Sequence, residues 1–481
     1  MSMRRLIGVA GFFAAVGAGV SGPAQVAARA QAPASVPVTF SEHVAPIVFA
    51  NCTPCHRPGE AAPFQLLSYR DARPLAKAMA AAAAAHVMPP WKPGPSDYAF
   101  HGARGLTAQQ IETLQRWAEG GAPEGDPAKL PPLPKFTDGW QLGPPDLIVT
   151  MDQAYEVPQR GPDVYRNFVL PLNLDRDVWV RAIDFRPSAR PVVHHSLFFL
   201  DSTGSARGLD AEDPAPGFPG GMGGVRITGA GRAGLGNPAQ ATGSLGGWAL
   251  GGRALELPEG LAFPVAKGSD LILSTHFHPS GSTQMEKSTV GLYFASRPPA
   301  QAFTSIQLPP VFGVFEGLDI PAGQERYTVK DSFTLPVDVR AFSIGAHAHY
   351  LGKEMKLTAA FPDGAVRTLL WIKDWDFSWQ ERYRFEDFVA LPKGTRLDVE
   401  ISWDNSAANK RNPTRPPARV TWGEESNDEM GSVGLQLVAA NPGELPELQR
   451  VYAEFVRSAA LSRPGLRQLI QQRRLRAAGR Q

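Results

Sequence analysis

Short runs of apolar residues, many of them alternating with polar ones, fill the chain from about residue 140 to residue 440. Examples are DLILSTHFH at 270–278 and VGLQLVAA at 433–440. Turn-forming residues separate the runs, and this pattern is typical of antiparallel β-sandwiches. The region is too long for one sandwich, so we predict two, at 140–296 and 297–442, with the seam near ASRPPAQAF.

Helical patterns occupy the preceding region. FSEHVAPIVFANCTPCH and SYRDARPLAKAMAAAAAAH are rich in helix-forming residues, and the prolines of MPPW end the second run. In LTAQQIETLQRWAEGG, Thr107 can cap a helix on which Ile111, Leu114 and Trp117 recur at helical spacing. We therefore predict an all-α unit at 36–132, followed by a proline-rich linker.

The N-terminal segment 1–32 has the features of an export signal. Arg4 and Arg5 precede the apolar run LIGVAGFFAAVGAGV, and small-residue patterns such as Ala28-Arg29-Ala30 follow it. The run is short for a membrane span, so we predict a cleaved signal, no stable membrane span and a periplasmic or secreted protein. An uncleaved anchor is the alternative.

Two other segments differ from the strand pattern. The glycine-rich stretch 203–253 has little periodicity and is predicted to be a long loop. The C-terminal segment 443–481 is predicted to be a basic helical tail exposed to solvent. Hydrophobic residues make up 43% of the chain, enough to bury a core, and the net charge of +2 gives no reason to expect nucleic acid as a partner.

The motif NCTPCH contains the only two cysteines of the 481 residues. Cys-x-x-Cys-His is the attachment pattern of c-type haem, with Cys52 and Cys55 bound to the haem and His56 on its iron. Met88 is the first choice for the second iron ligand, because it lies roughly thirty residues after the motif, where a small cytochrome usually supplies its methionine, and a thioether ligand raises the haem potential. His86 and Met79 are competitors. The predicted fold is thus multidomain, with an N-terminal all-α c-type cytochrome domain followed by two antiparallel, jelly-roll-like β-sandwiches.

Histidines cluster in the predicted β region. Six of the ten fall in three close pairs, His194-His195, His276-x-His278 and His347-x-His349. Alternate residues of a strand share a face, so His-x-His can bind one metal ion from one strand. Adjacent histidines reach one ion only at a bulge or a strand end. One pair alone could be half core and half surface, but three pairs together indicate metal binding.

The ligands that accompany the histidines decide which metal the site favours. Imidazole suits zinc, copper, iron and nickel, whereas a thioether beside imidazoles favours copper. Met430 in ESNDEMGSVGLQL and Met355, close to His349 in the sequence, are both candidates for that thioether.

Four motifs in the β region resemble the copper type II, ascorbate-dependent monooxygenases, the family of the peptidylglycine α-hydroxylating and dopamine β-monooxygenases. VVHHSLFFL and LSTHFHPSG resemble the segments that hold the electron-relay copper, which implies His194, His195 and His276 as its ligands. GAHAHYLGK and NDEMGSVGLQL resemble those of the oxygen-binding copper. The ligands implied for that copper are His347, His349 and Met430, which favours Met430 over Met355. A haem segment in front is similar to bacterial cytochrome-fused members.

This resemblance implies an oxidoreductase that hydroxylates a C–H bond of a small organic substrate with dioxygen. It implies two copper ions beside one covalent haem c. Because the haem motif is tethered to the same chain, we predict that electrons pass singly from the haem to the first copper and on to the second. An ascorbate-like reductant or a periplasmic electron carrier would supply the haem. The chain departs from the animal enzymes in having no cysteines for disulfides, and His278 has no role that the family provides.

Two other functions remain open from the sequence. The chain could be a periplasmic electron-transfer or copper-binding protein without oxygenase activity. Zinc in the histidine sites would instead suit a hydrolase, although Met430 and the haem motif disfavour it.

Overall fold

The computed structural model describes residues 37–58, 60, 62–136, 139–220, 244–249, 252–423, 425–465, 467–468 and 470–471. Residues from Val38 to Gln481 form one compact unit. The predicted signal segment 1–32 lies outside the described residues. None of the helices in the described ranges is both long and apolar enough to cross a membrane.

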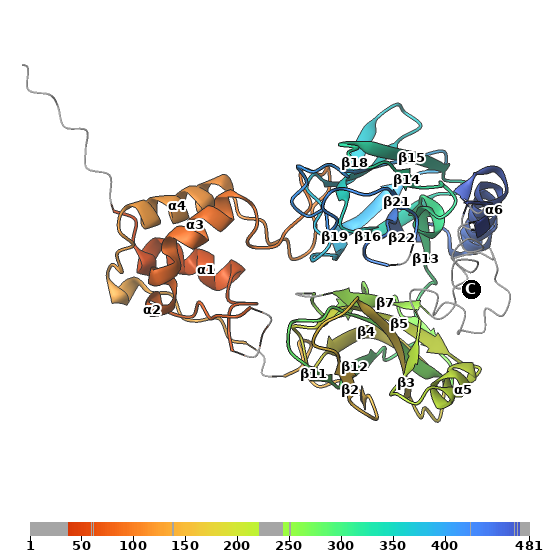
Figure 1. Ribbon diagram of the computed structural model, residues 1–481, viewed down its shortest axis with the longest axis horizontal. Coiled ribbons are helices and arrows are strands. Elements are labelled where there is room, and N and C mark those ends of the chain that lie inside the picture. The colour runs from red at the N-terminus through yellow and green to blue at the C-terminus, as the bar shows by residue number, and fades with distance from the viewer. Residues whose placement is uncertain are drawn as a thin grey trace, which may run out of the picture. The chain divides into compact units, whose positions relative to one another are not determined.

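The first β-sandwich is formed by β1 to β12 (Figure 1). One sheet has the order β1-β12-β4-β8, with β9 also on β4, and the other has the order β6-β3-β10-β5-β7. The strands are β1 (Leu147–Thr150), β2 (Tyr155–Val157), β3 (Val164–Pro171), β4 (Val178–Arg186), β5 (Val193–Asp201), β6 (Phe218–Pro219), β7 (Ser244–Ala249), β8 (Leu255–Glu256), β9 (Phe263–Val265), β10 (Asp270–Phe277), β11 (Gln284–Glu286) and β12 (Thr289–Phe294).

The second β-sandwich is formed by β13 to β22. Its sheets have the orders β13-β22-β16-β19 and β15-β20-β17-β18, and the pairs are antiparallel. The strands are β13 (Thr304–Leu308), β14 (Asp319–Ile320), β15 (Tyr327–Thr334), β16 (Val339–Ala348), β17 (Gly352–Ala360), β18 (Val366–Ile372), β19 (Arg382–Leu391), β20 (Arg396–Trp403), β21 (Val420–Thr421) and β22 (Gly431–Ala439).

Each sandwich encloses its own apolar core, and the two cores touch. Alternation along β20 buries Leu397, Val399 and Ile401 on one face, as the period of two requires. Phe342 and Val438 belong to strands of the second sandwich, yet they pack in the core cluster of the first.

Short helices form the N-terminal part of the unit. They are η1 (Phe40–Val44), α1 (Ala45–Asn51), α2 (Tyr69–Ala72), η2 (Arg73–Leu75), α3 (Ala76–Ala84), α4 (Ala108–Glu119) and η3 (Pro127–Lys129). Thr107 caps α4 in a capping box with Gln110, as the sequence predicts for that N-terminus. Phe40 and Trp117 are fully buried between these helices.

The prediction of an N-terminal all-α cytochrome domain at 36–132 is wrong. Among the described residues, strand (34%) exceeds helix (20%), and the helices of the N-terminal part are few and short. Residues after α3 run extended instead, because closely spaced prolines exclude a helix. Pro93 forms a bridge with Ile372 of β18, and Phe100 forms one with Phe385 of β19. Phe100 therefore packs in the core of the second sandwich.

Two further predictions need correction. The stretch 203–253 is not simply a loop, because it contains α5 (Ser205–Glu212) and the short strands β6 and β7, although 221–243 lies outside the described residues. The C-terminal segment is helical at α6 (Leu445–Ser462), after η7 (Pro442–Glu444), but this helix is not solvated on all sides. Leu448, Tyr452 and Val456 are buried on the second sandwich, since they recur at helical spacing on one apolar stripe.

Candidate metal centres and haem motif

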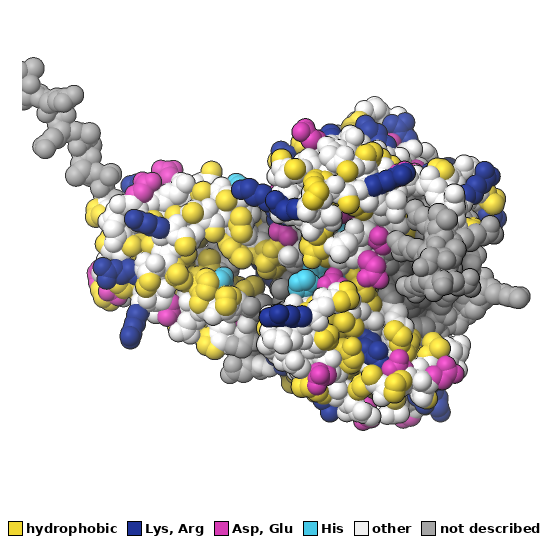
Figure 2. Space-filling view, in the orientation of Figure 1, with side chains coloured by type: hydrophobic (Ala, Val, Ile, Leu, Met, Phe, Trp, Pro, Cys, Tyr) yellow, Lys and Arg dark blue, Asp and Glu magenta, His cyan; other side chains and the backbone are white. Residues whose placement is uncertain are grey.

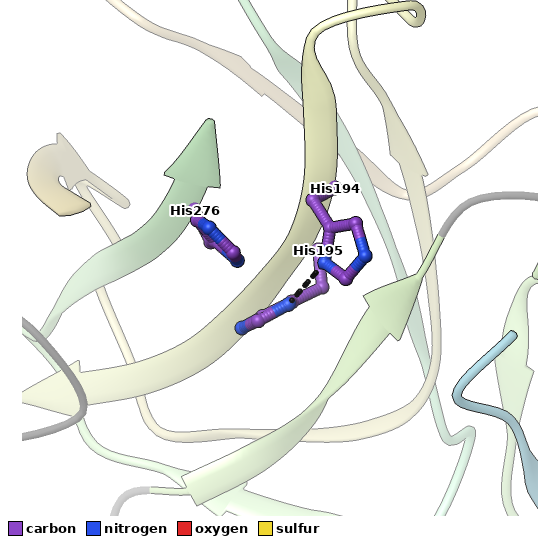
Figure 3. A group of neighbouring side chains, drawn as sticks. All are labelled: His194, His195 and His276. Atoms are coloured by element: carbon purple, nitrogen blue, oxygen red, sulfur yellow. Dashed lines mark hydrogen bonds between the residues drawn. The ribbon is translucent and has the colours of Figure 1, made fainter. Parts of the chain in front are cut away.

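A β-bulge in β5 brings two adjacent histidines to one side of a sheet. His276 of β10 pairs with His195, and the next residue, Phe277, pairs with Val193. His194 is therefore the extra residue of the bulge, which is the geometry that the sequence required for a His-His pair to reach one ion. Figure 3 shows the three imidazoles pointing toward one another from two neighbouring strands.

These three histidines, His194, His195 and His276, form the first cluster. One nitrogen from each lies within 4.8 Å of the others, and the Nδ1 atoms of His194 and His195 are 3.1 Å apart. The Nδ1 atom of His276 is buried and has no hydrogen-bond partner. A buried polar atom without a partner is costly, so this nitrogen is suited to a ligand at the centre of the cluster.

A carboxylate holds the opposite side of the His276 ring. Asp163 hydrogen-bonds His276 Nε2 at 2.8 Å and His278 Nδ1 at 2.8 Å, and it accepts a hydrogen bond from Ser426 Oγ. Burial raises the pKa of Asp163, but these hydrogen bonds outweigh burial and lower it below the usual range. The ring of Tyr165 stacks on His276 at a centroid distance of 4.3 Å. His278 is thus a partner of the carboxylate, with its side chain largely exposed.

The second cluster consists of His347 and His349, and Met430 directly precedes the neighbouring strand β22. The two imidazole centroids are 5.2 Å apart, because alternate residues of an extended chain share a side. His347 Nδ1 hydrogen-bonds Gln380 Oε1 at 2.6 Å, whereas its buried Nε2 has no partner. His349 Nδ1 donates to the carbonyl of Asp428 at 3.1 Å. Each ring therefore has one nitrogen fixed by the protein.

Met430 lies at the start of β22, next to Gly431, which pairs with Ala348. The carboxylate of Glu429 accepts hydrogen bonds from the backbone N–H groups of His349 and Met430, so it ties the two segments together. Burial raises the pKa of Glu429 to about 8. The competing thioether of Met355 is fully buried in the apolar core of the second sandwich.

Burial keeps most of these imidazoles neutral. It lowers the pKa of His194 to about 3, of His347 to about 4 and of His349 to about 3, and it lowers that of His195 strongly. Repulsion from neighbouring histidines adds to the effect at His194 and His195. Neutral imidazole is the form that binds metal ions, so both clusters are ready ligands at neutral pH.

The CxxCH motif follows α1 in a turn. His56 N–H donates to the Cys52 carbonyl at 2.9 Å, and His56 Nδ1 donates to the carbonyl of Phe64 at 3.2 Å. Both cysteines are free thiols, and burial raises the pKa of Cys52 to about 12. The hydrogen bond to Phe64 fixes the orientation of the His56 ring and leaves its Nε2 atom available to bind iron.

The candidates for the second haem ligand occupy different surroundings. Met88 follows α3 and is 37% exposed, and His86 beside it is also exposed. Met79 packs against the core of the N-terminal helices. The choice of Met88 stays a prediction, because no contact between these side chains and His56 distinguishes them.

Three supporting residues were not predicted from the sequence: Asp163, Gln380 and Glu429. Each is joined to a candidate ligand by a hydrogen bond from a distant part of the chain or from a loop. In the sequence, only the positions of two of these residues could have indicated a supporting role. Glu429 directly precedes Met430, and Asp163 directly precedes a strand.

No family model and no curated protein matches this chain. Among solved structures, the infectious bursal disease virus VP2 subviral particle is 9% identical, with a TM-score of 0.18, covering 65% of this chain and 76% of that one. The cowpea mosaic virus top component is 9% identical, with a TM-score of 0.27, covering 60% and 89%. PNGF-II is 11% identical, with a TM-score of 0.23, covering 63% of each chain. Such low scores carry no argument about this protein.

Proposed function

We propose that this protein is a copper-dependent monooxygenase that hydroxylates a C–H bond of a small organic molecule with dioxygen. The observation that carries the proposal is the convergence of five imidazoles, from distant parts of the sequence, into two neighbouring clusters. His194, His195 and His276 would hold one copper ion. His347, His349 and Met430 would hold the other.

The donor atoms suit copper. The buried nitrogens of His276 and His347 that have no hydrogen-bond partner are the atoms that would bind a metal ion in each cluster. Imidazole binds several metals, but a thioether at the second cluster favours copper over zinc. Copper bound at these sites would supply one-electron chemistry and the activation of dioxygen.

The chain's own residues prepare the sites for that chemistry. Asp163 and Gln380 hold His276 and His347 in one orientation, which leaves the opposite ring nitrogens free for a metal. Glu429 ties the backbone of Met430 to the backbone of His349. The hydrogen-bonded backbone around Glu429 is buried, so water is excluded from that side of the second cluster.

We propose that Cys52, Cys55 and His56 bind haem c and that the haem supplies electrons from an external donor. Two ion pairs fix the motif's loop, because Glu60 binds both Arg57 and Arg190, each at 2.9 Å. Arg190 lies four residues before His194, at the entrance to β5. The haem loop is thus anchored to the segment that leads to the first cluster.

Metal analysis with an absorption spectrum of the purified protein tests this function. We expect two copper ions and one covalent haem per chain, with substrate-dependent oxygen consumption in the presence of a reductant. A His347→Ala variant should retain the haem, lose one copper and lose hydroxylation. Full copper loading in that variant would remove the assignment of the second cluster. Haem reduction without oxygen consumption, for every substrate offered, would indicate an electron carrier instead.

A further inference from the structure

One aromatic ring contacts histidines of both clusters. Phe377 belongs to the loop between β18 and β19 and is 3% exposed. Its ring centroid is 4.6 Å from that of His194 in the first cluster and 5.4 Å from that of His349 in the second. It also lies 6.3 Å from the ring of His276. The two clusters are therefore joined by ring contacts through a single phenylalanine.

Hydrogen bonds fix the loop that carries this ring. The carbonyl of Phe377 accepts a hydrogen bond from Gln380 Nε2 at 3.1 Å, and the other end of the Gln380 amide binds His347. Trp375, buried in the second sandwich, donates from Nε1 to the His349 carbonyl at 3.2 Å. The loop thus contacts both histidines of the second cluster, which leaves the Phe377 ring little freedom to move.

A buried apolar ring has a definite effect between two metal sites. The phenylalanine ring fills its own volume, so neither a side chain shared by the two sites nor a bridging water can lie there. The ring itself offers no ligand atom and no hydrogen bond. Removing the ring would leave a cavity bordered by imidazoles, and a polar cavity of that size admits water. With the ring in place, the sites are close neighbours but remain separate.

We propose that Phe377 is a positioning residue, a spacer that fixes the separation of the two metal centres and excludes water from between them. This role rests on the proposed function for the presence of the metals. The ring contacts do not depend on metal, so one test uses the metal-free protein and a second uses the copper-loaded protein.

The first test is the nuclear magnetic resonance spectrum of ¹³C-labelled histidine in the metal-free full-length chain. An aromatic ring at these distances shifts the signals of both neighbouring imidazoles, so Phe377→Leu should move the signals of His194 and His349 together. Phe312→Leu is the matched control, because the Phe312 ring contacts His347 at 5.2 Å. The control should move the His347 signal and leave that of His194 in place. If Phe377→Leu moves only one of its two expected signals, the ring does not span the clusters and the proposal is overturned.

The second test is pulsed electron paramagnetic resonance of the chain loaded with two Cu(II) ions. The wild type should give one narrow copper–copper distance, and Phe377→Ala should broaden or shift it with copper content unchanged. Phe377→Leu retains most of the apolar volume and replaces the alanine variant if that chain does not fold. An unchanged distance with both coppers bound would overturn the spacer role alone. Failure of the wild type to bind two coppers would overturn the proposed function, and the spacer role between metals with it.

Discussion

Replacing Asp163 should weaken metal binding at the first cluster and leave the second unaffected. The carboxylate bonds the Nε2 atom of His276 at 2.8 Å, and this bond aims the unpartnered Nδ1 atom at His194 and His195. Without it, the His276 ring can rotate and loses basicity. Removing such a partner of a metal-ligating histidine costs 10- to 100-fold in affinity, or about 1.4 to 2.7 kcal/mol.

Asp163→Asn and Asp163→Ala should lower the copper affinity of the first cluster by different amounts. Asp163→Asn keeps an oxygen that can accept from His276 but removes the charge, so we expect a loss near tenfold. Asp163→Ala removes the acceptor and leaves His276 Nε2 without a partner, so we expect a loss near 100-fold. The hydrogen bond to Ser426, in the loop before β22, would be lost as well.

The assay is a Cu(I) titration against a coloured competing chelator. The His347→Ala background isolates the first cluster, because one ligand of the second is then missing. His278→Ala is the matched control. It removes another partner of the same carboxylate, but that side chain is 58% exposed and should change the affinity little. If Asp163→Ala binds copper as tightly as the His278→Ala control, the reasoning about His276 is wrong.

Three further outcomes are expected. Replacing Cys52 and Cys55 by serine should abolish covalent haem while copper content stays the same, which a spectrum of the denatured protein and metal analysis would show. The contribution of Glu429 to the stability of the metal-free protein should fall as pH rises from about 4.5 to about 8, because the folded state keeps a proton on Glu429 that the unfolded state loses. The histidines with lowered pKa act in the opposite direction below about pH 6.5, so the test compares the variant with the wild type. In thermal unfolding across this range, the stability of Glu429→Gln should rise more steeply with pH, or fall less steeply, than that of the wild type, and an equal slope would contradict the assignment. Thr107→Ala should destabilise α4 by about 1 kcal/mol, measured by denaturant unfolding.

Local patterns predicted the parts of the fold that depend on local physics. Alternation predicted the sandwich strands, and the Thr107 cap was predicted from residue type and spacing. The adjacency of His194 and His195 required a bulge or strand end, and a bulge is present. These features need no knowledge of which strand lies beside which.

Other features depend on partners far away in the sequence. Asp163 and His276 are separated by 113 residues, so periodicity gives no sign that they meet. The proline-rich segment around Pro93 was expected to end a helix, and it does, but its bridge to β18 depends on an available sheet edge 279 residues later. The burial of α6 was missed for a different reason. Leu448, Tyr452 and Val456 recur at helical spacing, but the prediction was based on the basic residues that follow α6 at 467–481.

The bulge in β5 makes the length of this strand as important as its composition. Side chains in a regular ladder alternate between faces, so deleting one residue at this point would restore the alternation. Phe198 and Leu200 could still fill the core, while one imidazole would be lost from the cluster. The deletion of a single residue would therefore convert a three-histidine site into an ordinary strand. Any alignment of related chains should place this inserted residue first.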